Sequence, residues 1–369
     1  MLAPTDIQLL LARTESFAAQ AFECASAADA DAAIDETLWA EFHRSGLAMA
    51  AFPTSLGGLG LIESNSQSDL CTVLRLLGAG DLSTARLIEG HINAIALVCR
   101  YGTAAQQASL AADVRSGALA AVWGAEDAAG LKIVRQGNHD ELRGRKILAS
   151  GAGFVTQPIV TAKSGDDQYM FLLRIAPDHP VDLSGWTAQG MRSTATGAID
   201  LTGMRVGPDE QVGAAGDFMR QPYLSGGAWR FCAAHLGAME RLVDLFRHHL
   251  VARGRGEDPY QLQRIAACVA AARTARFWVE EAARRFGSEA DAETIVAFAN
   301  MTRMVTERSA LDIMENVQRG VGLLAFIRPD PIERICRDLA TYLRQPVPDL
   351  AMSNAARAWL NSSLPVGEF

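Results

Sequence analysis

Apolar residues recur every three or four positions through the first third of the chain, residues 6–118. Leu38 and Phe42, four positions apart, and Leu10 and Phe17, two helical turns apart, illustrate this spacing, which places apolar side chains on one face of an α-helix. Residues 51–61, AFPTSLGGLGL, interrupt the pattern with one proline and several glycines, and these residues predict a loop. We therefore expect a set of helices at the N-terminus, joined across this loop.

The pattern changes between residues 119 and 215 to short runs rich in valine, isoleucine and leucine, such as KIVRQ, ELRGRKILAS, PIVTAKS and QYMFLL. Runs of this length and composition predict β-strands. The dipeptide Gly137-Asn138 lies between two of the runs and is favoured in tight turns. Proline and glycine clusters separate the other runs, so the middle of the chain is predicted to be a β-domain.

Helical spacing returns after Gly216 in three long segments, and then in a shorter segment at residues 331–344 that begins with proline. Helices in this arrangement are typical of a bundle. The sequence thus predicts an α+β protein with an N-terminal helical domain (1–118), a central β-domain (119–215) and a C-terminal helical bundle (216–369).

Charge and cysteine usage exclude several classes of function. The formal net charge of −8 argues against nucleic-acid binding, although Arg253 and Arg255 are enough to hold one diphosphate. The six cysteines are far apart and form no CxxC or Cys/His pattern, so neither a disulfide framework nor a metal site is expected. No apolar run approaches the roughly 20 residues that cross a bilayer. We expect a cytoplasmic protein that binds no membrane.

Four segments, in order, resemble the acyl-CoA dehydrogenase superfamily. Residues 101–130 are similar to its helix, loop and first β-strand, and residues 142–153 to its Gly-x-Lys strand. Residues 190–213 resemble the end of its β-domain, and residues 317–342 its late glycine turn and Arg-Asp pair. The resemblance covers roughly residues 36–345. It implies a β-barrel-like central domain, a C-terminal four-helix bundle, and pairing of copies into homodimers or homotetramers.

The resemblance also implies an FAD site. In the family, the turn after the first β-strand and the loop after the Lys strand hold the flavin ring, largely through backbone hydrogen bonds. Two departures weaken this half of the site: Ala125 replaces a threonine and Leu148 replaces an aromatic residue, each a loss of about 1 kcal/mol. The flavin contacts carried over are Trp123, Ala125, Glu126, Leu148, Ser150 and Gly151.

The diphosphate and adenine of the family's FAD are held across a subunit interface, by an arginine and by a glutamine with neighbouring glycines. Arginine and glycine suit this role, since a guanidinium binds a diphosphate through two hydrogen bonds and glycine exposes backbone amides. A gapless alignment would put Asn316 in the glutamine's place. The residues nearest to the family pattern are Arg253 or Arg255, Gln318, Gly320 and Gly322.

The family's catalytic base is missing from this sequence. Dehydrogenation of a thioester needs a carboxylate that removes a proton, usually a glutamate shortly after the Arg-Asp pair. Alignment on that pair places Pro346 there, and the alternative base position in residues 251–255 has no acid either. Asp349 is a weak candidate, and Glu240 or Glu257 weaker still, because such residues are commonly solvated or salt-bridged.

The residues that would bind substrate in the family are also altered. An aspartate and an arginine at the start of the first C-terminal helix become Gly227 and Arg230, so only the arginine remains to bind substrate. His235 lies on the same helix, where a buried structural histidine is the expected role. Acyl-CoA, or another acyl carrier, is therefore implied by the resemblance and not by the residues.

Two functions remain open. The first is an FAD-dependent oxidoreductase that either dehydrogenates a thioester-like substrate or uses reduced flavin and oxygen for monooxygenation, which needs no carboxylate base. The second is a non-catalytic protein on the same scaffold. It would be either the partner of a catalytic chain in a hetero-oligomer or a binding protein.

Overall fold

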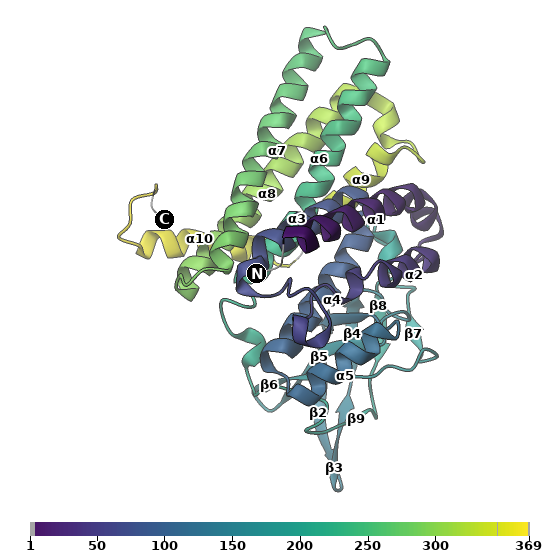
Figure 1. Ribbon diagram of the computed structural model, residues 1–369, viewed down its shortest axis with the longest axis vertical. Helices are drawn as coiled ribbons and strands as arrows, with labels where there is room; N and C mark the ends of the chain where they lie inside the picture. Colours follow the sequence, from purple (N-terminus) through teal and green to yellow (C-terminus); the bar gives the residue numbers. More distant parts are fainter. Residues whose placement is uncertain (1–3, 345, 368–369) are drawn as a thin grey trace.

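The computed structural model describes residues 4–344 and 346–367 (Figure 1). Its N-terminal part is helical, as predicted, and residues 51–61 form turns and a short 3-10 helix instead of an α-helix. Asp81 begins α4, because its side chain accepts hydrogen bonds from the backbone N–H and the hydroxyl of Thr84. The helices are α1 (Pro4–Asp31), α2 (Glu36–Arg44), α3 (Gln67–Gly80), α4 (Leu82–Tyr101) and α5 (Ala104–Arg115).

The middle of the chain forms a seven-stranded sheet and a three-stranded sheet, which confirms the predicted β-domain. β2 and β3 pair as an antiparallel hairpin around Gly137 and Asn138, and Gly137 has the positive φ of +61° that glycine tolerates. The strands are β1 (Ala120–Trp123), β2 (Lys132–Gln136), β3 (His139–Arg143), β4 (Arg145–Ala149), β5 (Gln157–Ser164), β6 (Asp167–Leu172), β7 (Val181–Asp182), β8 (Gly197–Asp200), β9 (Arg205–Val206) and β10 (Gln211–Val212).

The run ELRGRKILAS is divided between the two sheets. Gly144 separates β3 from β4, and β3 pairs with β2 and β9 whereas β4 pairs with β8. Gly144 has φ +119°, and a Cβ there would lie 2.4 Å from the carbonyl oxygen of Gly130. Only glycine fits this close approach of two backbones, so the chain can turn from one sheet into the other.

The C-terminal part is helical, and Figure 1 shows α6, α7 and α8 side by side above the β-domain. The predicted shorter helix is α9. A further helix, α10, lies against α8 and was not predicted: Pro346 precedes it, Pro348 is its first residue, and among its residues only Ala351 and Ala355 are buried. The helices are α6 (Trp229–Ala252), α7 (Pro259–Phe286), α8 (Ala292–Val321), α9 (Pro331–Tyr342) and α10 (Pro348–Asn361).

Buried charges connect α9 to the rest of the molecule. Arg334 Nη1 lies 2.7 Å from Asp81 Oδ1, and both side chains are about 95% buried. Asp338 accepts a 2.6 Å hydrogen bond from the backbone N–H of Met191, and Arg337 pairs with Asp29 of α1 at 2.8 Å. Burial and the nearby Asp81 raise the pKa of Asp338 to about 7. These contacts join α9 to α1, to the start of α4 and to the loop before β8.

His91 joins α4 to two other segments. Its Nε2 lies 2.9 Å from the carbonyl oxygen of Ala48, and its Nδ1 accepts a 3.0 Å hydrogen bond from the backbone N–H of Ala120. Burial lowers its pKa to about 4, so the ring is neutral with the proton on Nε2. Neither nitrogen is available for chemistry, and the role of His91 is structural.

Within residues 4–344 and 346–367, no helix is both long enough and apolar enough to cross a membrane.

Replacing Asp81 with asparagine is expected to lower the free energy of unfolding by about 3 kcal/mol, because the buried Arg334 charge loses its 2.7 Å partner and keeps only the more distant Asp338 carboxylate at 4.0 Å. Chemical denaturation measures the change. Adding Arg334→Met to the Asp81→Asn variant should recover part of the loss. Arg308→Met, which breaks an exposed pair with Asp312, is the control and should cost less than about 1 kcal/mol. A loss no larger than that of the control would contradict the assigned role of the buried pair.

Candidate functional site

A buried lysine fixes the turn after β1. Lys146 of β4 is fully buried, and its Nζ lies 3.2 Å from Glu126 Oε2, 3.3 Å from the Gly124 carbonyl oxygen and 3.0 Å from Thr161 Oγ1. The Glu126 carboxylate also accepts a 3.0 Å hydrogen bond from the backbone N–H of Leu131. Burial lowers the pKa of Lys146, and the Glu126 charge opposes that shift. The Glu126 side chain therefore holds the turn in place through Lys146 and the Leu131 backbone.

An irregularity in β4 exposes an apolar side chain beside this turn. The pairing of β4 with β8 shifts register between Lys146 and Ala149, and Leu148 in between has φ +51° and is 57% exposed. Such bulges turn a side chain out of its usual alternation. Trp123 Nε1 donates a 2.9 Å hydrogen bond to the carbonyl oxygen of Ser150, which joins the end of β1 to the loop after β4.

The structure thus brings together the residues predicted for the flavin ring. Trp123, Ala125 and Glu126 lie at the end of β1, and Leu148 and Ser150 lie at the end of β4. The Ser150 hydroxyl is half-buried, and the Thr196 hydroxyl lies 3.4 Å from it. The remaining predicted residue, Gly151, directly follows Ser150 with φ +74° and donates its backbone N–H to the loop before β8.

The residues predicted for the diphosphate and adenine lie at the end of the bundle where α6 and α8 finish. The side-chain oxygen of Gln261 accepts a 2.9 Å hydrogen bond from Arg255 Nη2, and the Gln261 side chain also lies against Gly320, so it lies between the two predicted segments. Arg253 is exposed. Gln318 is half-buried in the last turn of α8.

One copy of the chain does not bring the two predicted halves together. The turn after β1 belongs to the β-domain at one end of the longest axis, whereas Arg255 lies in the α6–α7 turn at the other end (Figure 1). Gly254 and Gly322 have φ +63° and +80°, and no atom lies within 4 Å of where a Cβ would stand. The diphosphate half of the predicted site is therefore an open surface.

None of the three acids named from the sequence lies at the position of the missing base in the residues that the structure describes. The Pro346 carbonyl oxygen accepts a hydrogen bond from Arg303 of α8, and Asp349 is exposed in the first turn of α10. Glu240 lies between two arginines, 2.7 Å from Arg75 and 3.7 Å from Arg276, and Glu257 is exposed. The two weaker candidates are thus salt-bridged and solvated, as the sequence suggested.

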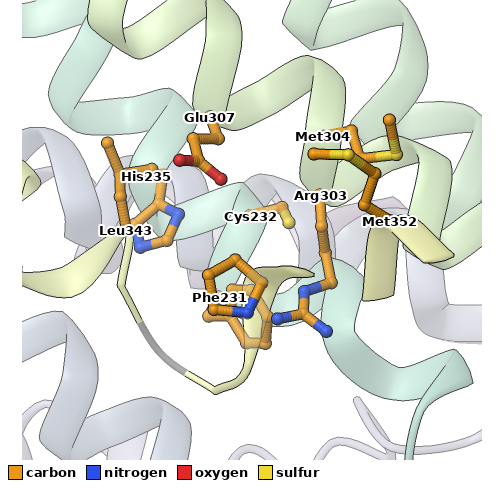
Figure 2. A pocket seen from close by; sticks show the side chains of 9 residues that line it. Phe231, Cys232, His235, Arg303, Met304, Glu307, Leu343 and Met352 are labelled. Carbon is orange, nitrogen blue, oxygen red and sulfur yellow. The ribbon is translucent and has the colours of Figure 1, made fainter. Parts of the chain in front are cut away.

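A small cavity lies under α10 beside the Pro346 segment (Figure 2). Its volume is about 20 Å³, the size of one water molecule, so it holds neither a flavin nor an organic substrate. Buried His235 lines it, with Nε2 unbonded and its ring edge-on to the Tyr342 ring at 4.5 Å. Burial and the charge of Arg303 lower the pKa of His235 to about 3. The other lining residues are Phe231, Cys232, Met304, Glu307, Leu343, Pro348 and Met352.

The structure adds a charged cluster that the sequence analysis missed, between α4, α6 and α9. Arg86 Nη1 lies 2.9 Å from Glu89 Oε2, and Asn93 donates to the other oxygen of Glu89. Arg230 Nη1 lies 3.4 Å from Asn93 Oδ1, and the buried hydroxyl of Tyr342 has no partner. The sequence does contain one indication of this cluster. The spacing of Arg86, Glu89 and Asn93 puts three polar side chains on one face of a largely apolar helix.

No cluster of three or more histidine, cysteine, aspartate or glutamate side chains suited to a metal occurs in the part of the chain that the structure describes.

Replacing His235 with phenylalanine is expected to flatten the pH dependence of stability. As pH falls below about 6.5 the unfolded chain protonates His235 while the folded chain keeps it neutral down to about 3, so folded stability falls. Between pH 4 and 6 the wild-type slope should exceed the variant slope by up to about 1.4 kcal/mol per pH unit. Urea denaturation at several pH values measures both, and parallel curves would show that His235 is protonated in the folded protein.

The sequence matches two known protein domains. Residues 4–118 match the model of the acyl-CoA dehydrogenase N-terminal domain, and residues 218–343 match that of the C-terminal domain. No curated protein sequence matches the chain.

Solved structures of similar fold include both monooxygenases and a dehydrogenase. Dibenzothiophene monooxygenase TdsC from Paenibacillus sp. A11-2, solved with FMN and indole, has 19% identity and a TM-score of 0.83 over 96% of this chain and 98% of its own. Methanesulfinate monooxygenase MsuC from Pseudomonas fluorescens has 21% identity and a TM-score of 0.83 over 99% of each chain. Butyryl-CoA dehydrogenase from Megasphaera elsdenii has 18% identity and a TM-score of 0.84 over 98% of this chain and 100% of its own.

The two domain matches together span most of the sequence, and the helical, β and helical parts of the structure follow the same order. The chain belongs to the acyl-CoA dehydrogenase family.

Proposed function

We propose that the protein is an FAD-dependent oxidoreductase that oxygenates a small molecule with reduced flavin and O₂. The observation that carries this proposal is the absence of a base: Pro346 stands where the family has a carboxylate, and Arg303 binds its carbonyl oxygen. α,β-Dehydrogenation of a thioester requires that base. The names of TdsC and MsuC show that this fold also serves monooxygenases, for which the carboxylate is dispensable.

The residues at the ends of β1 and β4 fit a flavin ring. Leu148 offers an exposed apolar side chain for the ring face, and the Ser150 hydroxyl lies beside it for the polar edge. Lys146 and Glu126 hold the turn from below, which orients its backbone amides without contact between their side chains and the ring. The substitution at Ala125 removes one hydroxyl, and a backbone-held ring tolerates that loss.

Each residue group then has a separate task. Bound flavin supplies electron transfer and, once reduced, reaction with oxygen. Lys146, Trp123 and Ser150 keep the two loops in a fixed relation. Arg230 and Tyr342 contribute a cation and a hydroxyl that are kept away from bulk water and can orient a polar substrate. Tyr342 remains protonated, since burial raises its pKa, so its hydroxyl is a hydrogen-bond donor.

We further propose that two copies of the chain share each FAD. Arg253, Arg255 and Gly322 lie on an exposed end of the bundle, far from the flavin loops of the same copy (Figure 1), whereas Gly320 is buried against Phe246. A two-fold pairing that sets this surface of one copy against the β-domain of the other would complete the site. The expected assembly is a homodimer, or a homotetramer built from two of them.

Mixed dimers test the shared FAD site. Leu148→Glu and the double change Arg253→Met with Arg255→Met should each weaken FAD binding by about tenfold or more, since one disturbs the ring face and the other removes the cations. Co-expression of the two variants should restore tight binding at about a quarter of the sites, because only mixed dimers contain one intact site. Flavin absorbance after size-exclusion chromatography measures occupancy. No recovery in isolated mixed dimers would mean that each copy holds its FAD alone.

Oxygen-18 labelling tests the proposed chemistry. The FAD-loaded protein, reduced chemically and then exposed to ¹⁸O₂ with methanesulfinate or indole, should place one labelled oxygen atom in an organic product. Mass spectrometry detects the label, and free reduced FAD is the control. Hydrogen peroxide as the sole product with every compound tried would count against monooxygenation. A protein that binds no FAD would favour the non-catalytic alternative.

A further inference from the structure

We infer that the substrate of this protein carries an anionic oxygen group, a carboxylate or a sulfur oxyanion, and that Arg230 binds it. The inference rests on the proposed function in one respect, that the ligand lies next to the flavin loops. It concerns the substrate class and not the cofactor.

Arg230 is a buried cation without a counter-ion. Only Arg230 and Arg334 are more than nine-tenths buried among the arginines of the described residues, with exposures of 7% and 4%. Arg334 has Asp81 at 2.7 Å, whereas no carboxylate lies within 4.0 Å of Arg230. The nearest polar contact of Arg230 is the 3.4 Å approach to Asn93, and its Nε has no partner. Buried charges of this kind are normally paired, so the Arg230 guanidinium is suited to an anionic ligand.

The groups around Arg230 leave an excess of positive charge. Glu89 is the one acid in the cluster, and it is already bound by Arg86 and Asn93. Burial lowers the pKa of Arg230 to about 10, so it remains charged at neutral pH. Arg100, with its guanidinium 3.5 Å from the Tyr223 ring centre, adds further positive potential. One anionic group would offset the charge of Arg230, which Glu89 leaves unpaired.

The remaining neighbours of the cluster carry no charge that could substitute for a ligand. Burial raises the pKa of Cys232 to about 12 and lowers that of His235 to about 3, so both side chains are neutral. Burial raises the pKa of Tyr342, so its hydroxyl is protonated and neutral as well.

The cluster lies between the flavin loop and the segment where the family carries its base. On α4, Leu87 follows Arg86 directly, and its Cδ2 lies 3.2 Å from where a Cβ of Gly151 would stand. On α9, Tyr342 precedes Pro346 by four residues. Helices α4 and α9 thus each carry a residue of the cluster next to a residue that leads to one of these two segments.

The surroundings of Arg230 favour a small ligand with an apolar body. Its guanidinium lies 4.8 Å from the Phe286 ring centre and 5.4 Å from that of Trp229. These rings hold the cation in place and exclude water from it. A long alkyl chain would instead leave Arg230 desolvated without a partner, which is costly. The cluster thus selects a short oxyanion and disfavours a simple fatty acyl chain.

Calorimetric titration of the full-length protein, with and without FAD, tests the inference in a buffer free of phosphate and carboxylate. The probes are propionate, methanesulfonate and the neutral propionamide. We expect at least one of the two anions to bind, and at least about tenfold more tightly than propionamide. Arg230→Gln should abolish this preference. Arg303→Gln, the same loss of charge on α8, is the matched control and should keep it.

Glu89→Gln provides a test that loss of folding cannot imitate. Removal of the only acid increases the positive charge of the cluster, so the anions should bind several-fold more tightly. Two results with the folded wild type would overturn the inference: no anion binding, or equal binding of anion and amide. An unchanged anion affinity in Arg230→Gln, or a weaker anion affinity in Glu89→Gln, would also overturn it. Anion binding by a protein that takes up no FAD would leave it intact and would reject the proposed function instead.

Discussion

The ion pair between Arg334 and Asp81 fixes the arrangement on which the site depends. Asp81 caps α4 and Arg334 belongs to α9, so one buried contact sets these two helices against each other. Asp338, one turn further along α9, holds the loop before β8 through the backbone of Met191. α4 then carries the charged cluster, and the end of α9 carries Tyr342. A polar core of this kind is strongly destabilised if one partner is removed, because the other charge stays buried.

The same scaffold explains how the family's cofactor half can persist while its base is absent. Lys146 and Glu126 hold the flavin turn through contacts below it, and these do not involve the C-terminal segment. The base, in contrast, depends on the identity of one residue in the segment after α9, which here is Pro346 and is held by Arg303. Loss of the carboxylate therefore leaves the fold intact. It changes the chemistry that the site can perform.

Much of this fold could be predicted from the spacing of apolar residues, because long amphipathic helices and the Gly137-Asn138 hairpin have strong local signals. α10 was missed because Pro346 and Pro348 lie at its start, where prolines favour a break in helical structure, although its sequence includes apolar residues such as Leu350 and Leu360. The split at Gly144 depends on a contact with Gly130 that no local pattern records. The boundaries of the three domains remain a prediction.

The candidate site was only partly predictable. Resemblance identified Trp123, Leu148 and Ser150, which the structure brings together, and the Trp123 contact with Ser150 joins their loops. It did not indicate that Glu126 would be used by Lys146, because that pair forms only when β4 lies beside the end of β1. The charged cluster was missed for a similar reason, since Arg230 meets Asn93 across 137 positions of sequence.

The central claim is that this fold is retained without the proton abstraction that defines the dehydrogenases. Anaerobic mixing of the FAD-loaded protein with a series of short- to long-chain acyl-CoAs, followed by visible absorbance, tests it most directly. The account predicts that the oxidised flavin band stays unchanged with every acyl-CoA, because no carboxylate removes the proton. Bleaching of that band by any of them would show that another group acts as the base, and would contradict the account.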